Sequence, residues 1–472
     1  MLAQAETVDA TATVTGVHRA LVLELESAHS DQAQQSHVLE VADALFHRAV
    51  LTDLLPARRA RARDELAELM SAVAPWAELD PHHDPYRTVA DTAEPLAAGD
   101  LVPHELTARV LHLLARTDLP ELGTAGPAER LKTEATVMNW LGRQTSSGLS
   151  VAQVEKYLRA KTGEPISVES VAELSGGFSK TTTAVSLRRP GREPERIVLR
   201  QITPGRDSHT LAGEYEVLRF VWERGVTVAE PLWIEPQSNA LGGPFFASRR
   251  AEGGNLGDVF GPDEGTGPEA AGELARALAR LHTVELDNMP DTPVAPMSTH
   301  GEILAAIDEQ ERLVAAADPA GGLVVHPLQN LLFAWLRTHA PSGVPRPVLL
   351  HGDPGFHNIL VRDGALTALL DWERARVGDA AQDLAYVRPH VTRVQPWEDF
   401  LRVYREAGGE APDDDRLRFY SVWHDAWRFV GAYRGLGRLV SQPRTLLDGV
   451  LGLLHAPRFL LSGLENAFEV QL

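Results

Sequence analysis

The feature that most constrains the fold is a change of hydrophobic pattern near residue 150. From there to about residue 250, short apolar runs alternate with turn residues, as in an antiparallel sheet. The strands predicted from these runs are 168–174, 181–187, 197–201, 232–235 and 244–248, with helices at 151–161 and 210–222. Beyond residue 252 helical spacing dominates and is interrupted by one hairpin at 359–370. We therefore expect an α+β fold in which a small, mainly antiparallel-sheet lobe precedes a larger helical lobe.

The predicted domains follow from the same pattern. Residues 1–122 keep a spacing of three to four between apolar residues and should form an all-α domain. A polar segment within residues 123–149 is typical of a linker. Residues 150–250 then form the sheet lobe and residues 251–472 the helical lobe.

Composition limits the classes of partner. The 472 residues include 45 basic and 65 acidic side chains, a formal charge of −20, which disfavours binding to nucleic acids or anionic membranes. The absence of cysteine excludes disulfides and thiolate metal sites. We find no signal-peptide pattern at the N-terminus and no membrane-spanning run, so we expect a cytoplasmic protein with a small-molecule partner. Its oligomeric state stays open, with a homodimer as one option.

The residues with the clearest chemistry surround the predicted hairpin. Asp363-Gly364 is a strong two-residue turn signal, and counting outward from it places Asn358 opposite Leu369. Asp371 then lies two residues further along, about 7 Å away at ~3.3 Å per residue. An amide and a carboxylate oxygen at that separation suit one Mg²⁺ ion. Asp353 lies five residues before Asn358, where it can accept a proton from a substrate hydroxyl.

Upstream residues are suited to holding phosphate groups. Ser175, Gly176 and Gly177 connect two strands, where backbone N–H groups can approach an anion without interference from side chains. Arg200 ends an apolar strand and could reach the α- and β-phosphates of a nucleotide. Glu214 lies on the apolar face of the following helix, and Arg200 is its expected cationic partner. Each residue alone also has a structural interpretation as a turn, a strand cap or a solvated charge.

Taken together, the motifs resemble the aminoglycoside-phosphotransferase-like family, which has the protein-kinase-like fold, over roughly residues 150–440. The most specific matches are His351-Gly-Asp353…Asn358, Leu370-Asp371-Trp-Glu373 and Gly378-Asp-Ala-Ala-Gln-Asp383-Leu-Ala-Tyr386. The resemblance implies that Asp353 is the catalytic base, that Asn358 and Asp371 hold Mg²⁺, and that His351 orders the loop. The family often has lysine where this chain has Arg200.

Within that family, the segments Val198–Arg200 and Phe419–Tyr433 are similar to one branch. It includes kinase-like domains fused to acyl-CoA dehydrogenases and a 4-hydroxyacyl-CoA kinase that works with a small helical partner protein. Residues 84–111 faintly resemble that partner.

Three functions remain open at this stage. The first is an ATP- and Mg²⁺-dependent kinase for a small-molecule hydroxyl, with a hydroxyacyl-CoA as the favoured acceptor and GTP not excluded as the donor. The second is an antibiotic kinase for aminoglycosides, whose positive charge suits the acidic chain. The third is a nucleotide-binding scaffold without catalysis. Candidates for lining the acceptor site are Glu373, Asp379, Asp425, Trp427 and Arg428.

Overall fold

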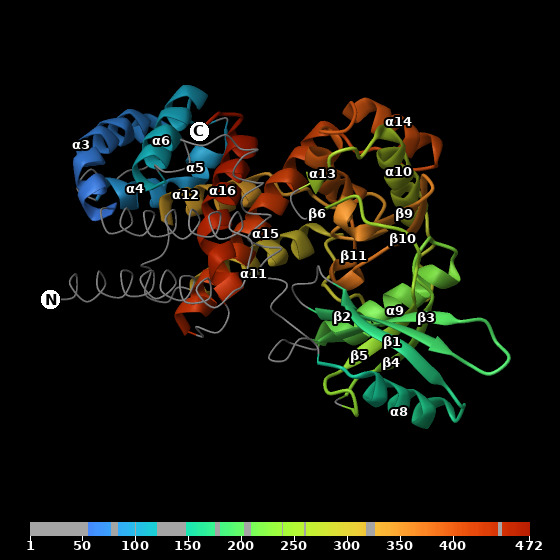
Figure 1. The fold of residues 1–472 in the computed structure, drawn as a ribbon. Helices are drawn as coiled ribbons and strands as arrows, with labels where there is room; N and C mark the ends of the chain where they lie inside the picture. Colours follow the sequence, from blue (N-terminus) through green and yellow to red (C-terminus); the bar gives the residue numbers. More distant parts are fainter. Residues whose placement is uncertain are drawn as a thin grey trace. The chain divides into compact units, whose positions relative to one another are not determined.

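The computed structural model describes residues 55–76, 84–99, 101–119, 148–174, 180–202, 209–237, 239–258, 261–317, 326–441 and 446–472 (Figure 1). The chain divides into two compact units. The first takes Met1–Met138, Thr299–Ser342 and Asp414–Leu472, and the second takes Asn139–Ser298 and Gly343–Asp413. The second unit thus contains the predicted sheet lobe and part of the predicted helical lobe. The domain limits expected from the sequence, at residues 122, 149 and 250, remain predictions.

A five-stranded antiparallel sheet in the order β1-β2-β3-β5-β4 opens the second unit. Its strands are β1 (Ser167–Leu174), β2 (Lys180–Arg188), β3 (Glu195–Ile202), β4 (Pro231–Glu235) and β5 (Phe245–Arg249). Two helices cover its opposite faces, α8 (Val151–Thr162) and α9 (His209–Glu223), as Figure 1 shows. The strands and helices predicted between residues 150 and 250 are therefore confirmed.

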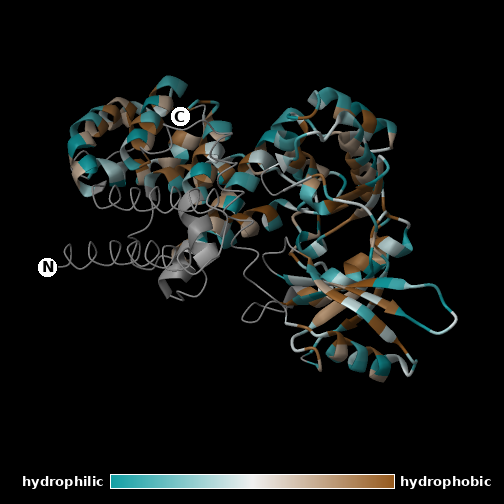
Figure 2. Cartoon of the chain, in the orientation of Figure 1, coloured by the Kyte–Doolittle hydropathy of each residue, from teal (hydrophilic) through white to brown (hydrophobic). Residues whose placement is uncertain are grey.

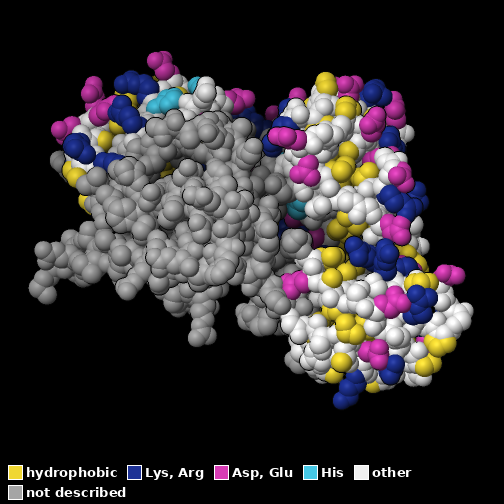
Figure 3. Space-filling model, viewed as in Figure 1, with side chains coloured by type: hydrophobic (Ala, Val, Ile, Leu, Met, Phe, Trp, Pro, Cys, Tyr) yellow, Lys and Arg dark blue, Asp and Glu magenta, His cyan; other side chains and the backbone are white. Residues whose placement is uncertain are grey.

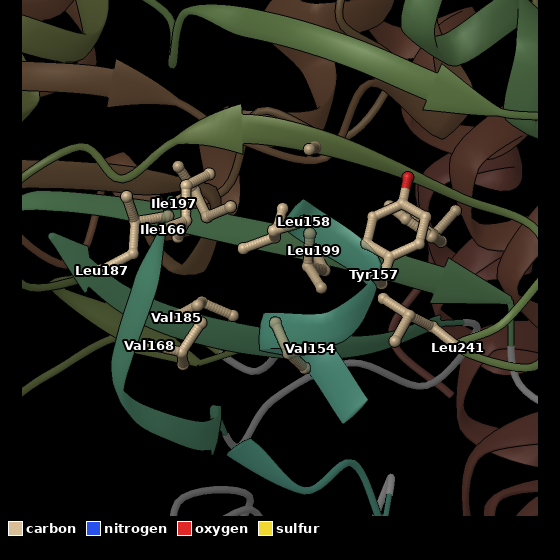
Figure 4. Packing of buried hydrophobic residues seen from close by; sticks show 12 residues of the cluster. Val154, Tyr157, Leu158, Ile166, Val168, Val185, Leu187, Ile197, Leu199 and Leu241 are labelled. Atoms are coloured by element: carbon tan, nitrogen blue, oxygen red, sulfur yellow. The ribbon is translucent and has the colours of Figure 1, made fainter. Parts of the chain in front are cut away.

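Helix α8 is stabilised at both ends and along one face. Ser150 and Gln153 form a reciprocal capping box at its start, and Gly163 ends it in the left-handed conformation (φ +69°). Its apolar residues Val154 and Leu158 enter a cluster contributed mainly by the sheet (Figure 4). The strand residues of this cluster are Val168, Val185, Leu187, Ile197, Leu199, Phe245 and Ala247. In Figure 2 the polar connection between β2 and β3 contrasts with these apolar strands.

The remainder of the second unit is mainly helical and contains three short strand pairs, two more than the single hairpin expected, because pairs of two or three residues are too short to show a strand pattern in the sequence. The helices are α10 (Pro268–His282), α13 (Ala380–Val391) and α14 (Trp397–Glu406), with short 3₁₀ turns η3 (Phe356–Asn358) and η4 (Trp372–Arg374). The strand pairs are β6 (Gly257–Asp258) with β7 (Gly261–Pro262), β8 (Val348–Leu350) with β11 (Arg376–Gly378), and β9 (Ile359–Arg362) with β10 (Ala365–Leu369). Helix α10 packs against α14, β8 and β10, and α13 packs against β8.

The described part of the first unit is helical, as expected for an N-terminal all-α region. Its helices are α3 (Leu55–Val73), α4 (Pro85–Asp91), α5 (Ala93–Ala97), α6 (His104–Asp118), α11 (His300–Ala317), α12 (His326–Thr338), α15 (Asp414–Ser441) and α16 (Leu446–Phe468), with the 3₁₀ turn η1 (Ala74–Trp76). Helix α15 packs along α16, and α12 packs against α4, α5, α6 and α16. Among the described residues, no helix is both long and apolar enough to cross a bilayer.

Candidate active site

A loop after β8 carries His351, Gly352 and Asp353, and the carboxylate of Asp383 on α13 anchors it. The backbone N–H groups of His351 and Gly352 each donate to Asp383 at 2.8 Å, one to each carboxylate oxygen. His282 Nε2 also lies 3.1 Å from Asp383. Burial raises the pKa of the Asp383 carboxyl, but these donors and the nearby imidazoles lower it by more. The loop is therefore fixed by a charged acceptor that the α13 helix supplies.

The fully buried His351 imidazole orders the same loop as a neutral ring. Its Nδ1 accepts a hydrogen bond from the Asp353 backbone N–H at 3.3 Å, so its Nε2–H donates to the Leu370 carbonyl at 2.8 Å. Burial lowers the pKa of the imidazole, which agrees with this uncharged form. His351 thus connects the Asp353 loop to the strand that precedes Asp371.

Asp353 is the carboxylate that this loop presents, and its side chain is 25% exposed. Burial raises the pKa of its carboxyl, but interactions with His357 and Tyr386 lower it to well below the ordinary range. The group is therefore an ionised proton acceptor with part of its surface accessible.

Asn358 and Asp371 lie at the same end of the β9–β10 hairpin. The turn itself is as predicted, with Asp363 and Gly364 at φ +52° and +81° and Arg362 opposite Ala365. The predicted alignment further along is wrong, because a bulge between Leu366 and Ala368 shifts the register by one. The Leu370 N–H donates to the Asn358 carbonyl at 2.8 Å, so Asp371 lies one residue beyond that pair rather than two.

The donor atoms at this position suit Mg²⁺. The Asn358 side-chain amide donates to the Asp353 carbonyl at 2.9 Å, which leaves its oxygen as the free end of the group. One Asp371 carboxylate oxygen accepts from Arg200 at 2.8 Å, so a cation already lies against it. Asp371 also has a left-handed backbone (φ +65°), a strained conformation that clusters at functional sites. The amide oxygen of Asn358 and the carboxylate oxygens of Asp371 are hard ligands of the kind that Mg²⁺ prefers.

Opposite charges gather where the sheet meets Asp371. Lys180 on β2 lies 2.9 Å from Glu214 on α9, and both side chains are only 1% exposed. Arg200 on β3 lies 3.6 Å from Glu214 and binds Asp371, while Lys180 also binds Glu373. We call these five residues the ion cluster.

The electrostatics of the ion cluster keep its cations charged. Burial lowers the pKa of the Lys180 ammonium, but Glu214 and Glu373 raise it by more. The pKa of the Arg200 guanidinium is likewise raised, because Asp371 and Glu214 outweigh its burial. Burial raises the pKa of the Glu214 carboxyl, and the two cations offset only part of this effect.

The expected pairing of Arg200 with Glu214 is confirmed, but Lys180, which lies closer to Glu214, was not predicted from the sequence. The alternation of side chains between the two faces of a strand could have revealed Lys180. Thr182 lies opposite Arg200 in the sheet, so Lys180 lies two residues along the same face. The odd-numbered residues Val185 and Leu199 point to the other face, toward α8.

Of the remaining predicted site residues, the structure describes Asp379 but not the glycine turn. Ser175, Gly176 and Gly177 lie outside the described residues. Asp379 is fully buried and caps α13 by accepting from the Ala381 N–H at 2.9 Å, so it has a structural function in the fold.

Three further acceptor-site candidates, Asp425, Trp427 and Arg428, belong to α15 in the other compact unit. There Asp425 accepts hydrogen bonds from Ser462 and Asn466 of α16 at 2.8 and 3.0 Å. Asp425 is thus engaged in holding α15 to α16.

Comparison with known proteins shows the family to which the chain belongs. The sequence pattern of the "Phosphotransferase enzyme family" matches residues 170–420. Acyl-CoA dehydrogenase family member 11 of Gallus gallus is 27% identical over 260 residues, and the mouse protein is 24% identical over 312 residues. These matches cover 53% and 61% of this chain but only 32% and 38% of the relatives, so the chain spans well under half of their length.

A solved protein of Ralstonia eutropha, described as a candidate aminoglycoside phosphotransferase, shares the fold. It is 20% identical, with a TM-score of 0.51, over 68% of this chain and 99% of its own. The family match covers more than half of the 472 residues. The structural likeness thus confirms the expected kinase-like fold, and the family match shows that the chain belongs to the phosphotransferase enzyme family.

Proposed function

We propose that this protein transfers the γ-phosphoryl group of ATP to a hydroxyl group of a small molecule, with Mg²⁺ as cofactor. The observation that carries the proposal is the grouping of an ionised, partly accessible Asp353 with the ion cluster and with Asn358 in one compact unit. Phosphoryl transfer needs a carboxylate that orients the attacking hydroxyl and a set of cations that holds the phosphates.

Each group in this arrangement has a defined task. Asp353 accepts the proton of the acceptor hydroxyl as its oxygen bonds to the γ-phosphorus and the bond to the ADP oxygen breaks. Lys180 and Arg200 provide positive charge for the donor phosphates, and Glu214 keeps both side chains in place. Mg²⁺ held by Asn358 and Asp371 would supply further positive charge to the same phosphates. Glycines at positions 176 and 177 would let backbone N–H groups approach the nucleotide.

The favoured acceptor is a hydroxyacyl-CoA. Support comes from the relatives named acyl-CoA dehydrogenase family member 11, which match 53% and 61% of this chain. On the face drawn in Figure 3, acidic and basic side chains of the second unit are interspersed, so surface charge there favours neither an anionic nor a cationic acceptor. An aminoglycoside is therefore the alternative acceptor, and GTP the alternative donor.

The test is ADP release by the purified protein with Mg²⁺ and ATP over hydroxyacyl-CoAs, free hydroxy acids and aminoglycosides, with mass spectrometry of the products. Asp353→Asn should abolish turnover and retain ATP binding. Asp363→Asn is the matched control, since that side chain is 93% exposed and its left-handed backbone (φ +52°) suits asparagine. Turnover with aminoglycosides alone would reject the acyl-CoA acceptor. Full activity of Asp353→Asn would reject the mechanism.

A further inference from the structure

The loop between Asp353 and Asn358 folds His357 back onto the Asp353 carboxylate. His357 Nε2 lies 3.5 Å from Asp353 Oδ1, and the imidazole is only 14% exposed. Oδ1 itself is buried and, within the described part of the chain, forms no hydrogen bond. Tyr386 also interacts with the Asp353 carboxyl, so His357 is one of the side chains that act on the proposed catalytic base.

Gly355 makes room for this arrangement. A Cβ atom placed on Gly355 would lie 2.4 Å from Cε1 and 2.5 Å from Nδ1 of the His357 ring, far inside any real contact distance. The backbone of Gly355 has φ −73°, a conformation open to every residue. The absence of a side chain at Gly355 therefore leaves room for the imidazole in this position, while the backbone itself makes no demand for glycine.

We propose that His357 is a positioning residue for Asp353 in the phosphotransfer proposed above. With Nε2 at 3.5 Å from Oδ1, the imidazole would restrict rotation of the carboxylate, so that its accessible part faces the acceptor hydroxyl. During transfer the hydroxyl proton passes to Asp353, the hydroxyl oxygen bonds to the γ-phosphorus, and the bonding electrons of the leaving group pass to the ADP oxygen. His357 touches none of these reacting atoms and acts only through the orientation of Asp353.

Orientation of this kind affects the chemical step more than binding. A misplaced catalytic group can cost about 100-fold in rate when the reacting atoms lose their alignment. Loss of His357 should therefore lower kcat, while KM for ATP changes little, because the ion cluster on the sheet side is untouched. An amide N–H in the same place should restore most of the lost kcat.

The test compares three variants of the full chain with its best acceptor. His357→Leu should lower kcat about ten- to hundred-fold at unchanged KM for ATP. His357→Gln keeps a terminal N–H donor near the position of Nε2 and should recover most of the loss. Gly355→Ala pushes the ring away without altering either side chain and should reproduce His357→Leu. Gly254→Ala is the matched control, since a Cβ there meets no atom within 4 Å.

The outcomes separate this proposal from the function on which it rests. Wild-type turnover with an unchanged kcat in both His357→Leu and Gly355→Ala would overturn the role of His357 alone. A kcat for His357→Gln no better than that of His357→Leu would also overturn it, because the donor would then not matter. Absence of wild-type turnover with every acceptor would overturn the proposed function and this role together. Equal thermal unfolding midpoints would show that the variants are folded.

Discussion

Replacing Lys180 by methionine tests the ion cluster most directly. The substitution keeps the length and apolar stem of the side chain but removes the ammonium that lies 2.9 Å from Glu214. Because both side chains are 1% exposed, the change leaves a buried carboxylate whose only other cation, among the described residues, is Arg200 at 3.6 Å. Breaking a buried ion pair in this way costs about 3–5 kcal/mol.

Arg200 still neutralises part of the Glu214 charge in Lys180→Met. We therefore expect a loss in the free energy of unfolding at the lower end of this range, about 3 kcal/mol. The measurement is urea denaturation followed by tryptophan fluorescence. Lys161→Met is the matched control, because Lys161 pairs with Glu235 at a position 32% exposed and should cost less than about 1 kcal/mol.

A double variant separates stability from function. Lys180→Met with Glu214→Leu replaces the buried pair by apolar groups, and such exchanges are often neutral for stability. The double variant should therefore regain most of the lost stability yet still bind ATP at least about tenfold more weakly than the wild type, a loss of about 1.4 kcal/mol. A stability loss equal to the sum of the two single variants, or no loss in Lys180→Met, would refute the account of this pair.

Two further predictions concern the loop and the metal ligands. His351 is neutral in the folded protein with a pKa below 6.5, so its stabilising contribution is complete above pH 6.5 and is lost as the pH falls. The free energy of unfolding should thus drop by up to about 1.4 kcal/mol more in the wild type than in His351→Gln between pH 7.5 and 5.5, measured by urea denaturation. Arg200→Met removes the guanidinium that competes with a metal ion for the Asp371 carboxylate. The nucleotide-free variant should therefore bind Mn²⁺ more tightly than the wild type in calorimetry, and an unchanged affinity would show that Arg200 does not compete.

Local signals were sufficient to predict the five-stranded sheet, its two helices and the β9–β10 hairpin, but not the short pairs β6–β7 and β8–β11. The Asp363-Gly364 turn needs two consecutive residues with positive φ, which few residue pairs supply, so its position could be read from the sequence. The apolar face of α9 likewise predicted that Glu214 points inward, and a buried carboxylate requires a cation.

The relative positions of Asn358 and Asp371 could not be predicted, because a bulge changes the register without a local signal. Thr367 lies at the bulge, where its hydroxyl is 2.5 Å from the Glu252 carbonyl and 3.1 Å from the Leu360 carbonyl. Thr367 is also an ordinary strand residue, so its presence in the run did not reveal the extra residue.

Lys180 illustrates the other limit of sequence reasoning, since its environment comes from three separate parts of the chain. Glu214 and Glu373 lie 34 and 193 residues away, and only the folded sheet brings both to one ammonium group. In the ion cluster three carboxylates outnumber two cations, so a divalent cation would reverse the excess charge and make room for an anionic phosphate chain. If the protein binds a nucleotide as proposed, this charge count predicts that the metal and the nucleotide bind together more tightly than either binds alone.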